Sequence, residues 1–196
     1  DIVNGGEGTD AFNLTLAGTN PASSAGAELS GVEQVFARSV GDNAASISLA
    51  SASGVEQTWN NSSLDDLTFD NVGSLTAVGV RNTATTTTVN YQNAALAAGD
   101  DNLTIVLDGA QDGAQVSVSS GGSNGIEAAT INSTGSSANT LTALNDSTGD
   151  IESLTITGAQ DLTLEATPNG VETVDASGAT GNIAAGLTSA FNNNDG

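Results

Sequence analysis

The chain has 196 residues, with 2 Lys+Arg against 23 Asp+Glu and a formal net charge of −21. This charge excludes a binder of nucleic acid or of anionic lipid surfaces, and it predicts that the partners of the chain are cations. The sequence contains no cysteine and no histidine, which excludes disulfides, soft-metal sites and the usual general base of enzymes. No apolar run reaches the ~18 residues of a membrane helix, so we expect no direct membrane insertion.

The predicted elements are short β-strands that follow one another along the whole chain. In each, apolar residues alternate with Thr, Ser or another polar residue, and Thr favours strands because it branches at Cβ. In chain order, the predicted strands cover residues 12–16, 47–49, 64–69, 75–78, 87–91, 103–107, 116–118, 126–131, 141–144, 151–156 and 162–164. They recur about every ten residues and are separated by Gly, Asn, Asp and Ser, which is typical of an all-β protein.

A phrase of Gly, then Val or Ile, then Glu precedes many of these strands. It occurs at residues 31–33, 54–56, 125–127 and 170–172, with a near copy at 150–152. The five glutamates stand 23, 71, 25 and 20 residues apart, and 71 is close to three further steps, so one unit recurs every 20 to 25 residues. This period predicts a parallel β-helix or related β-solenoid, in which the apolar residue of the phrase points inward at a corner. A β-sandwich with antiparallel hairpins is the alternative.

The glutamates of the phrase would stack on one another in a solenoid. Like charges directly opposite on neighbouring strands are unfavourable. Three arrangements relieve this repulsion: cations bridge the carboxylates, the side chains splay into water, or each carboxylate accepts hydrogen bonds from backbone amides at the corner. We favour this capping arrangement for the five residues, which are Glu33, Glu56, Glu127, Glu152 and Glu172.

Residues 5–13 read Gly-Gly-Glu-Gly-Thr-Asp-Ala-Phe-Asn and fit the calcium-binding nonapeptide G-G-x-G-x-D-x-U-x. Its glycines allow a tight turn whose carbonyl oxygens face a common point, and its aspartate adds a carboxylate. Ligation by oxygen alone selects a hard cation, Ca²⁺ before Mg²⁺. We therefore predict calcium as the cofactor, with Gly5, Gly6, Gly8 and Asp10 in the metal-binding turn. An ordinary glycine-rich turn is the alternative.

Three further acidic clusters are weaker candidates for metal ligands. Each borders a predicted strand or lies in a loop between two strands, where acidic residues also occur in solvated turns. Because a charge of −21 has to be neutralised, we expect at least one cluster to hold metal. The clusters are Asp65, Asp66 and Asp70; Asp100, Asp101, Asp108 and Asp112; and Asp146 with Asp150.

The nonapeptide GGEGTDAFN, the phrases GVEQVFA, GIEAATINSTG and GVETVDASGATGN, and the scarcity of Lys, His and Cys together point to a known family. The chain resembles RTX-type surface-layer (S-layer) proteins of Gram-negative bacteria. Large RTX adhesins and biofilm matrix proteins share this composition and this kind of repeated phrase. The resemblance implies secretion by a type I system, folding outside the cell on binding Ca²⁺, and assembly into a two-dimensional lattice. It maps the calcium turn of the family onto Gly5, Gly6, Gly8 and Asp10.

We predict two segments: residues 1–13 as the end of an RTX-type calcium turn, and residues 14–196 as a β-solenoid domain, together a fragment of a longer chain. The predicted function is a structural component of a secreted, calcium-dependent surface layer on the bacterial cell surface, in which Ca²⁺ bridges acidic loops. The expected partners are calcium, further copies of the chain and cell-surface polysaccharide. The alternative is an RTX adhesin or biofilm-matrix module that binds glycans or surfaces.

No enzymatic role is expected. Polysaccharide lyases with a parallel β-helix use Arg or Lys beside calcium, and the chain offers only Arg38 and Arg81. Glycoside hydrolysis needs two facing carboxylates roughly 5–9.5 Å apart, and such enzymes line their clefts with aromatic rings, which are few here. Trp59 with Asn60 and Asn61 is a candidate sugar platform, although a single Trp is more often a core or corner residue.

Overall fold

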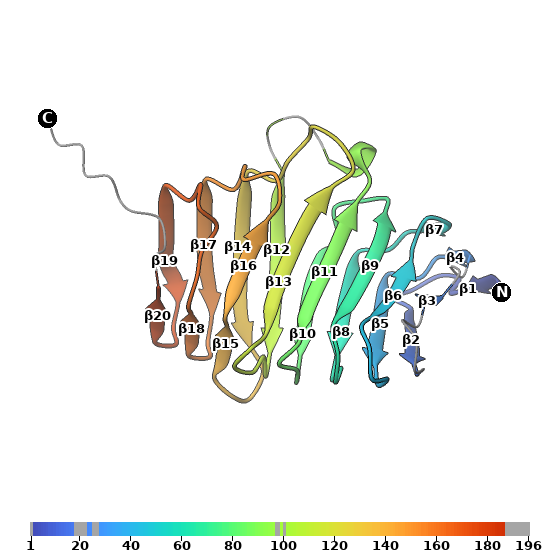
Figure 1. The fold of residues 1–196 in the computed structure, drawn as a ribbon, viewed down its shortest axis with the longest axis horizontal. Coiled ribbons are helices and arrows are strands. Elements are labelled where there is room, and N and C mark those ends of the chain that lie inside the picture. Colours follow the sequence, from blue (N-terminus) through green and yellow to red (C-terminus); the bar gives the residue numbers. More distant parts are fainter. Residues whose placement is uncertain (1, 18–22, 25–27, 97–98, 100, 187–196) are drawn as a thin grey trace, which may run out of the picture.

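The computed structural model describes residues 2–17, 23–24, 28–96, 99 and 101–186. These residues form a β-solenoid of about 7 turns, in which stacked coils follow one another in chain order (Figure 1). Every strand pairing between them is parallel. The predicted solenoid is therefore confirmed, because a sandwich built from hairpins would pair its strands antiparallel.

Two long sheets form the sides of the solenoid. From the N-terminal end, the eight-stranded sheet contains β2 (Ala11–Leu16), β5 (Gln34–Ser39), β8 (Gln57–Asn61), β10 (Ala77–Arg81), β12 (Asn102–Asp108), β14 (Ala128–Thr134), β17 (Ser153–Gly158) and β19 (Thr173–Ala179). The six-stranded sheet contains β3 (Ser23–Ser24), β6 (Ala45–Ser48), β9 (Leu67–Val72), β11 (Thr86–Tyr91), β13 (Gln115–Ser120) and β16 (Ala143–Asp146). Each coil thus adds one strand to the larger sheet, and most add one to the smaller sheet.

Shorter strands complete the coils near the two ends. β1 (Ile2–Asn4), β4 (Glu28–Ser30) and β7 (Ala52–Ser53) stack in one small sheet, and β15 (Asn139–Leu141), β18 (Leu162–Leu164) and β20 (Ile183–Ala185) stack in another. Among the described residues the helical structure is a single 3₁₀ turn, η1 (Asn93–Ala95). The domain boundary expected after residue 13 stays a prediction; β2 crosses it and pairs with β5.

The core consists of columns of inward-facing apolar residues. One column contains Val78, Ile105, Ile131 and Ile156, which are in register on four successive strands and have no exposed surface. Burying an aliphatic side chain of this size contributes about 1.5–3 kcal/mol relative to leaving it exposed. Burial alternates along β12, as the Leu-Thr-Ile type of alternation predicts.

The Gly-Val/Ile-Glu phrase forms a corner directly before a strand of the eight-stranded sheet. Its apolar residue points inward in every copy. The residues concerned, Val32, Val55, Ile126, Ile151 and Val171, are 0% to 7% exposed. In two copies the glycine of the phrase has a positive φ, 57° at Gly31 and 86° at Gly54, which glycine adopts without strain. In the near copy Gly149, one position earlier, has a φ of 75°. The predicted inward corner is confirmed.

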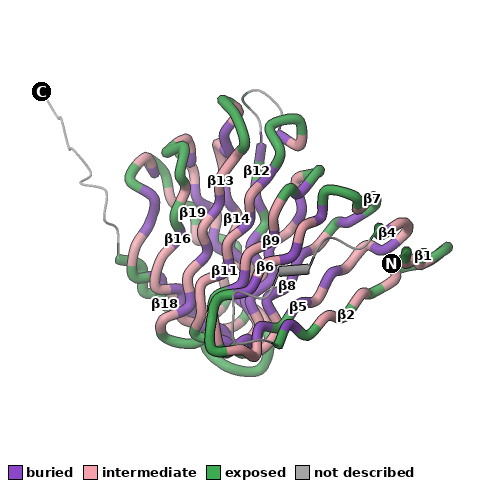
Figure 2. Tube along the Cα trace, turned by 45° about the vertical axis from the view of Figure 1, so that its right-hand side comes forward, coloured by how far each residue is buried: buried purple, intermediate pink, exposed green. Residues whose placement is uncertain are grey.

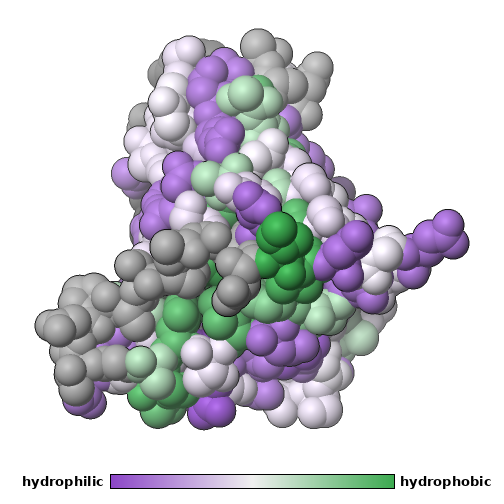
Figure 3. Space-filling view, turned by 90° about the vertical axis from the view of Figure 1, so that its right-hand side faces the viewer, coloured by the Kyte–Doolittle hydropathy of each residue, from purple (hydrophilic) through white to green (hydrophobic). Residues whose placement is uncertain are grey.

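Burial is less complete at the N-terminal end of the solenoid (Figure 2). Phe12 and Leu14 of β2 pair with Val35 and Ala37 of β5. The two β2 residues are only partly buried, whereas Val35 and Ala37 are 0% and 1% exposed. Apolar side chains accordingly gather on this end of the molecule in Figure 3, and Ile2 is 77% exposed. In a solenoid each coil contacts only its neighbours, so an end coil is covered on one side.

Candidate functional site

An acidic residue stands directly before almost every strand of the eight-stranded sheet. Because these strands are stacked about 4.8 Å apart, the acidic residues form a row along one corner of the solenoid, which we call the acidic ladder. The position before β10 carries Thr76 instead. The acidic ladder consists of Asp10, Glu33, Glu56, Asp101, Glu127, Glu152 and Glu172. Five of these are the glutamates of the repeated phrase, and the strand starts add the two aspartates.

The acidic ladder is interrupted in the fourth coil. The first residues of β2, β5, β8 and β10 are in register with one another, as are those of β12, β14, β17 and β19. Between β10 and β12, however, Val78 pairs with Ile105, so β12 begins two residues earlier than β10 in the common register. Thr76 at the interruption is 1% exposed. The ladder therefore has two segments, each of which begins with an aspartate followed by a glutamate.

Both segments begin with the same hydrogen-bonded pair. Glu33 Oε2 accepts a hydrogen bond of 2.8 Å from the amide of Asp10, and Glu127 Oε2 accepts one of 2.9 Å from the amide of Asp101. Each aspartate carbonyl in turn accepts hydrogen bonds of 3.0–3.2 Å from two amides of the next coil. The predicted capping of backbone amides is thus confirmed for two of the five glutamates.

The other three glutamates of the ladder have the splayed arrangement. Glu56, Glu152 and Glu172 are exposed, and their carboxylates accept no hydrogen bond from the described residues. Glu152 and Glu172 line a shallow groove of about 480 Å³ together with Asp101 and Glu127. Both arginines of the chain are engaged elsewhere, with Asp108 and with a backbone carbonyl. Negative charge therefore accumulates along this groove.

The nonapeptide turn is an enlarged version of the same corner. The pairing of β1 with β4 and of β2 with β5 places Gly5 opposite Gly31 and Asp10 opposite Glu33. Gly5 stands five positions before Asp10, whereas Gly31 stands two positions before Glu33, so the first corner carries three additional residues. Gly5 itself has no room for a side chain, because a Cβ there would overlap the carbonyl oxygen of Gly31. The turn and the next coil are in close contact.

This turn combines glycines of positive φ with a carboxylate oxygen that lacks a hydrogen-bond partner among the described residues. Gly6 and Gly8 have φ values of 95° and 117°, and the amide of Gly6 donates a hydrogen bond of 3.1 Å to Asn4 Oδ1. Asp10 Oδ2 is buried and has no hydrogen-bond partner among the residues that the structure describes. Burying a carboxylate oxygen without a partner is costly, because its lost hydration is not replaced. A hard cation bound at the turn would provide that partner.

The other predicted metal ligands are dispersed over the solenoid. Asp66 directly precedes β9 and Asp70 lies within it, whereas Asp101 directly precedes β12 and Asp108 is its last residue. A strand rises about 3.3 Å per residue, so the last two are roughly 20 Å apart and do not share an ion. Within the described ranges, no three acidic residues form a group that could hold a metal. Asp100 lies outside the described residues.

Several of these carboxylates bind donors in their own surroundings. Asp66 Oδ1 accepts a hydrogen bond of 2.8 Å from the amide of Thr86 on the next coil, and Asp70 Oδ1 accepts one of 2.6 Å from Asn90 Nδ2. Asp108 forms an ion pair of 2.8 Å with Arg81. These contacts hold neighbouring coils together.

The remaining cluster is a compact turn before β17. Asp146 accepts hydrogen bonds of 2.8–3.2 Å from the amides of Thr148, Asp150 and Ile151 and from the Thr148 hydroxyl. Asp150 lies against Gly125 of the preceding coil, where a Cβ would overlap its carboxylate. Of the other predicted ligands, Asp65 is partly buried and Asp112 is exposed. Metal binding by these residues stays a prediction.

Two capping aspartates were missed by the sequence analysis. Asp161 accepts hydrogen bonds from the amide and the side chain of Asn182 at 2.7 and 3.0 Å, and these bonds lower the pKa of its carboxyl group below 3.8. The side chain and the amide of Ser177 likewise lower the pKa of Asp175 below 3.8. The order Asp-Ala-Ser at residues 175–177 is typical of an Asx-turn, and this signal was available in the sequence.

Comparison of the chain with models of known protein families, with curated proteins and with solved structures found no match. The part of the chain that the structure describes has no helix long and apolar enough to span a bilayer.

Proposed function

We propose that this chain is a structural component of a secreted, calcium-dependent surface layer on the bacterial cell, in which Ca²⁺ binds along the acidic ladder. The observation that carries the proposal is the buried Asp10 Oδ2, which lacks a hydrogen-bond partner among the described residues beside the glycine-rich turn. A carboxylate in this situation is costly unless a cation accompanies it. The sequence of the turn supports calcium as that cation.

The charge of the whole chain supports the same conclusion. A net charge of −21 opposes any compact state and opposes contact between copies, because like charges repel. Ca²⁺ takes roughly six to eight oxygen ligands and accepts carboxylate and carbonyl oxygens together. At the first corner, the carboxylate of Asp10 and carbonyl oxygens of the loop formed by residues 6–8 would hold the ion. Bound calcium would stiffen the solenoid and allow copies to approach one another.

Calcium dependence can be tested by thermal unfolding and by titration calorimetry, in calcium and in a chelator. At a free calcium concentration about 100 times Kd, binding to the folded state alone stabilises it by about 2.7 kcal/mol. Asp10→Asn keeps the shape of the side chain but removes its charge, so we expect this variant to lose most of the gain from the first site. Asp42→Asn is the matched control, because Asp42 is exposed and lies in the loop after β5, at the far end of that strand.

Two results would contradict the proposal. Melting curves of the wild-type chain that coincide in calcium and in chelator would exclude a structural calcium site. Equal losses for Asp10→Asn and Asp42→Asn would show that calcium screens the net charge without binding at the first corner. Magnesium at the same concentration is expected to stabilise the chain less, because Mg²⁺ demands a stricter geometry and dehydrates reluctantly.

Assembly can be tested by electron microscopy of the purified chain in calcium. Ordered arrays are expected to form in calcium and to dissolve in chelator. Neutralising the exposed groove of the acidic ladder should prevent them, whereas neutralising three exposed acids elsewhere should not. The two triple variants change the net charge equally and are Glu127→Gln, Glu152→Gln, Glu172→Gln and, as the control, Glu28→Gln, Asp42→Asn, Glu165→Gln. Monomers that form no array in calcium but bind a glycan would favour the adhesin or matrix role.

A further inference from the structure

The two basic side chains of the chain lie on the same outer surface. Arg38 is on β5 and Arg81 is on β10, and the residue between them on β8 is Asn61. Arg81 pairs with Asn61, and the pairing of Ala37 with Asn60 places Arg38 in the same row. Two strand spacings of about 4.8 Å separate the two arginines. On a chain with a charge of −21, all the positive side-chain charge is therefore concentrated on three strands.

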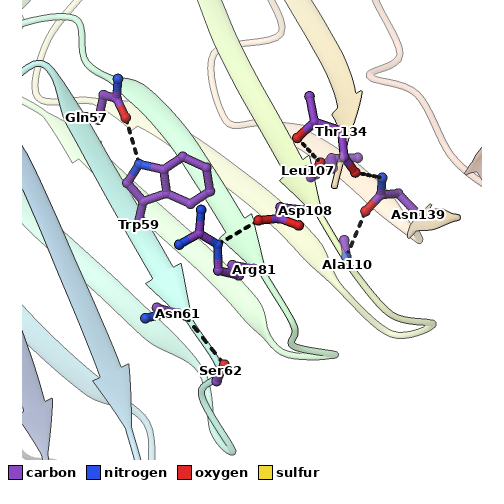
Figure 4. A network of polar contacts seen from close by, with 10 residues as sticks. All are labelled: Gln57, Trp59, Asn61, Ser62, Arg81, Leu107, Asp108, Ala110, Thr134 and Asn139. Atoms are coloured by element: carbon purple, nitrogen blue, oxygen red, sulfur yellow. Dashed lines mark hydrogen bonds and ion pairs between the residues drawn. The ribbon is translucent and has the colours of Figure 1, made fainter. Parts of the chain in front are cut away.

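An aromatic pair supports this row. Phe36 of β5 and Trp59 of β8 are stacked, with ring centroids 5.6 Å apart and ring planes 19° from parallel. The Trp59 ring covers Gly79 of β10 and takes the space in which a Cβ at that position would lie. The guanidinium carbon of Arg81 lies 4.6 Å from the centroid of the Trp59 ring, a cation–π contact (Figure 4). The aromatic pair therefore fixes the position of Arg81.

Each guanidinium is also held by its inner nitrogen. Arg81 Nε donates a hydrogen bond of 2.8 Å to Asp108 Oδ2, and Arg38 Nε donates one of 2.8 Å to the carbonyl oxygen of Ser62. The terminal nitrogens of both arginines make no hydrogen bond with any residue that the structure describes. Arginine presents these nitrogens as a planar fork that matches a carboxylate. Two such forks are thus oriented in advance and open to a ligand, which lowers the entropy cost of binding.

We propose that this surface, formed by β5, β8 and β10, binds a carboxylated polysaccharide that lies across the strands. Arg38 and Arg81 would each bind a carboxylate of one glycan chain, and the side-chain amide of Asn61, which lies between them in the row, would bind one of its hydroxyl groups. Charge complementarity selects an anionic ligand, because both cations of the chain lie on this surface and the carboxylate of Asp108 pairs with only one of them. Trp59 is 7% exposed, so it supports Arg81 and does not offer its ring face to a sugar.

A second copy of the chain is a poorer occupant of this surface. It would bring its own charge of −21 into the contact, and this repulsion would act over the whole interface. A single glycan chain brings its carboxylates at intervals along one line, as the two arginines require. The proposal goes beyond the surface-layer role, since it concerns a different face of the solenoid and requires no calcium.

The binding can be measured by affinity electrophoresis and titration calorimetry with polygalacturonate, with neutral dextran as the comparison ligand. Chelator is present throughout, so that calcium does not bridge acidic groups of protein and glycan, and the salt is about 0.15 M, where long-range fields are screened within ~8 Å. Arg38→Gln and Arg81→Gln are each expected to weaken binding about tenfold or more, as expected for loss of hydrogen bonds to a charged group. Arg38→Lys should retain part of the affinity.

Asn145→Asp is the control variant. It changes the net charge by the same amount as each arginine variant, and Asn145 is exposed on β16 of the other long sheet. We expect it to bind polygalacturonate like the wild-type chain. Circular dichroism of each variant establishes that the fold is kept.

The remaining outcomes would overturn the proposal. No binding of polygalacturonate by the wild-type chain would exclude the site, and equal binding of dextran would show that the arginines do not select the ligand. An equal loss of affinity for Asn145→Asp would show that the arginine variants bind less only because their net charge is more negative. Self-association of the wild-type chain that disappears in Arg38→Gln would assign the surface to a second copy. Because all samples contain chelator, these results are independent of whether the calcium site exists.

Discussion

The acidic residues of this solenoid fall into two groups that differ in what they do with their carboxylates. Those at turns, such as Asp66, Asp146 and Asp161, accept hydrogen bonds from backbone amides. Those at the exposed end of the acidic ladder, Glu152 and Glu172, stack on neighbouring coils and cap nothing among the described residues. The first group stabilises the fold without any ion. The second adds repulsion that only a cation or water can relieve.

The interruption of the ladder at Thr76 offers the strongest test of this comparison. Thr76→Glu would complete the row, but the side chain at this position is 1% exposed and an unpaired charge would be buried there. We expect a loss of about 3–5 kcal/mol in the free energy of unfolding, measured by urea denaturation. Thr76→Val is the matched control; Oγ1 of Thr76 has no partner in the described part of the chain, so this change should be neutral or stabilising. A loss below about 1 kcal/mol for Thr76→Glu would show that the position is open to water.

The contribution of the acidic residues at turns can be tested with Asp146→Ala. This change removes the acceptor for three amides and one hydroxyl, and the partly buried amides of Asp150 and Ile151 would lose their partner. We expect destabilisation of about 1–3 kcal/mol, equal in calcium and in chelator. Asp112→Ala, at an exposed position, should change stability by less than about 0.5 kcal/mol. A calcium-dependent effect of Asp146→Ala would instead place this residue among the metal ligands.

Glu127 and Glu152 are neighbours in the ladder, and replacing each with alanine should change the stability of the fold in opposite directions when chelator is present. Glu127→Ala removes the cap on the amide of Asp101 and is expected to destabilise the fold by about 1 kcal/mol. Glu152→Ala removes only a like charge from the row and should stabilise the fold by about 0.2–1 kcal/mol. Chemical denaturation of the two variants measures both effects. The same sign for both would show that capping and splayed glutamates do not differ.

The smallest effect on stability is expected from a change in pH. Asp161 and Asp175 have pKa values below the ordinary 3.8, because hydrogen bonds from Asn182 and Ser177 favour the charged form. Their contribution to stability is complete above pH 3.8 and is lost as the pH falls through the lower pKa of the folded state. Asp161→Asn should therefore make the melting temperature less sensitive to pH below 3.8. Titration of both carboxyl groups by NMR checks the direction of the shifts, and a midpoint above 3.8 would contradict it.

The sequence predicted the features of the fold that depend on neighbouring residues. The alternation of Leu-Thr-Ile and the inward residue of each Gly-Val/Ile-Glu phrase are local patterns, and Ile131, Ile151 and Ile156 are buried as these patterns require. The period of 20 to 25 residues gave the stacking of coils. Capping was predicted for all five glutamates and is found for Glu33 and Glu127, which accept the amides of Asp10 and Asp101 at the start of each segment. The amides opposite the other three glutamates already donate to backbone carbonyls of the preceding coil.

Features that depend on the register between coils could not be predicted. The two-residue offset between β10 and β12 interrupts the ladder at Thr76, and no local pattern marks that offset. Arg38 and Arg81 are 43 positions apart in the sequence, and only the stacking of three strands brings them into one row. The orphaned oxygen of Asp10 likewise depends on the next coil. The candidate calcium turn was therefore predicted as a motif, but the carboxylate environment that supports it was not.

The glycine at position 79 couples residues that are far apart in the chain. The Trp59 ring lies where a side chain of residue 79 would extend, so any larger residue there would push the indole off the sheet and release the arginine that rests on it. In related chains, Gly79 and Trp59 should change together, and replacement of this glycine should remove the aromatic support of Arg81. The absence of one methyl group thus determines whether the indole and the guanidinium of Arg81 can keep their positions on this surface.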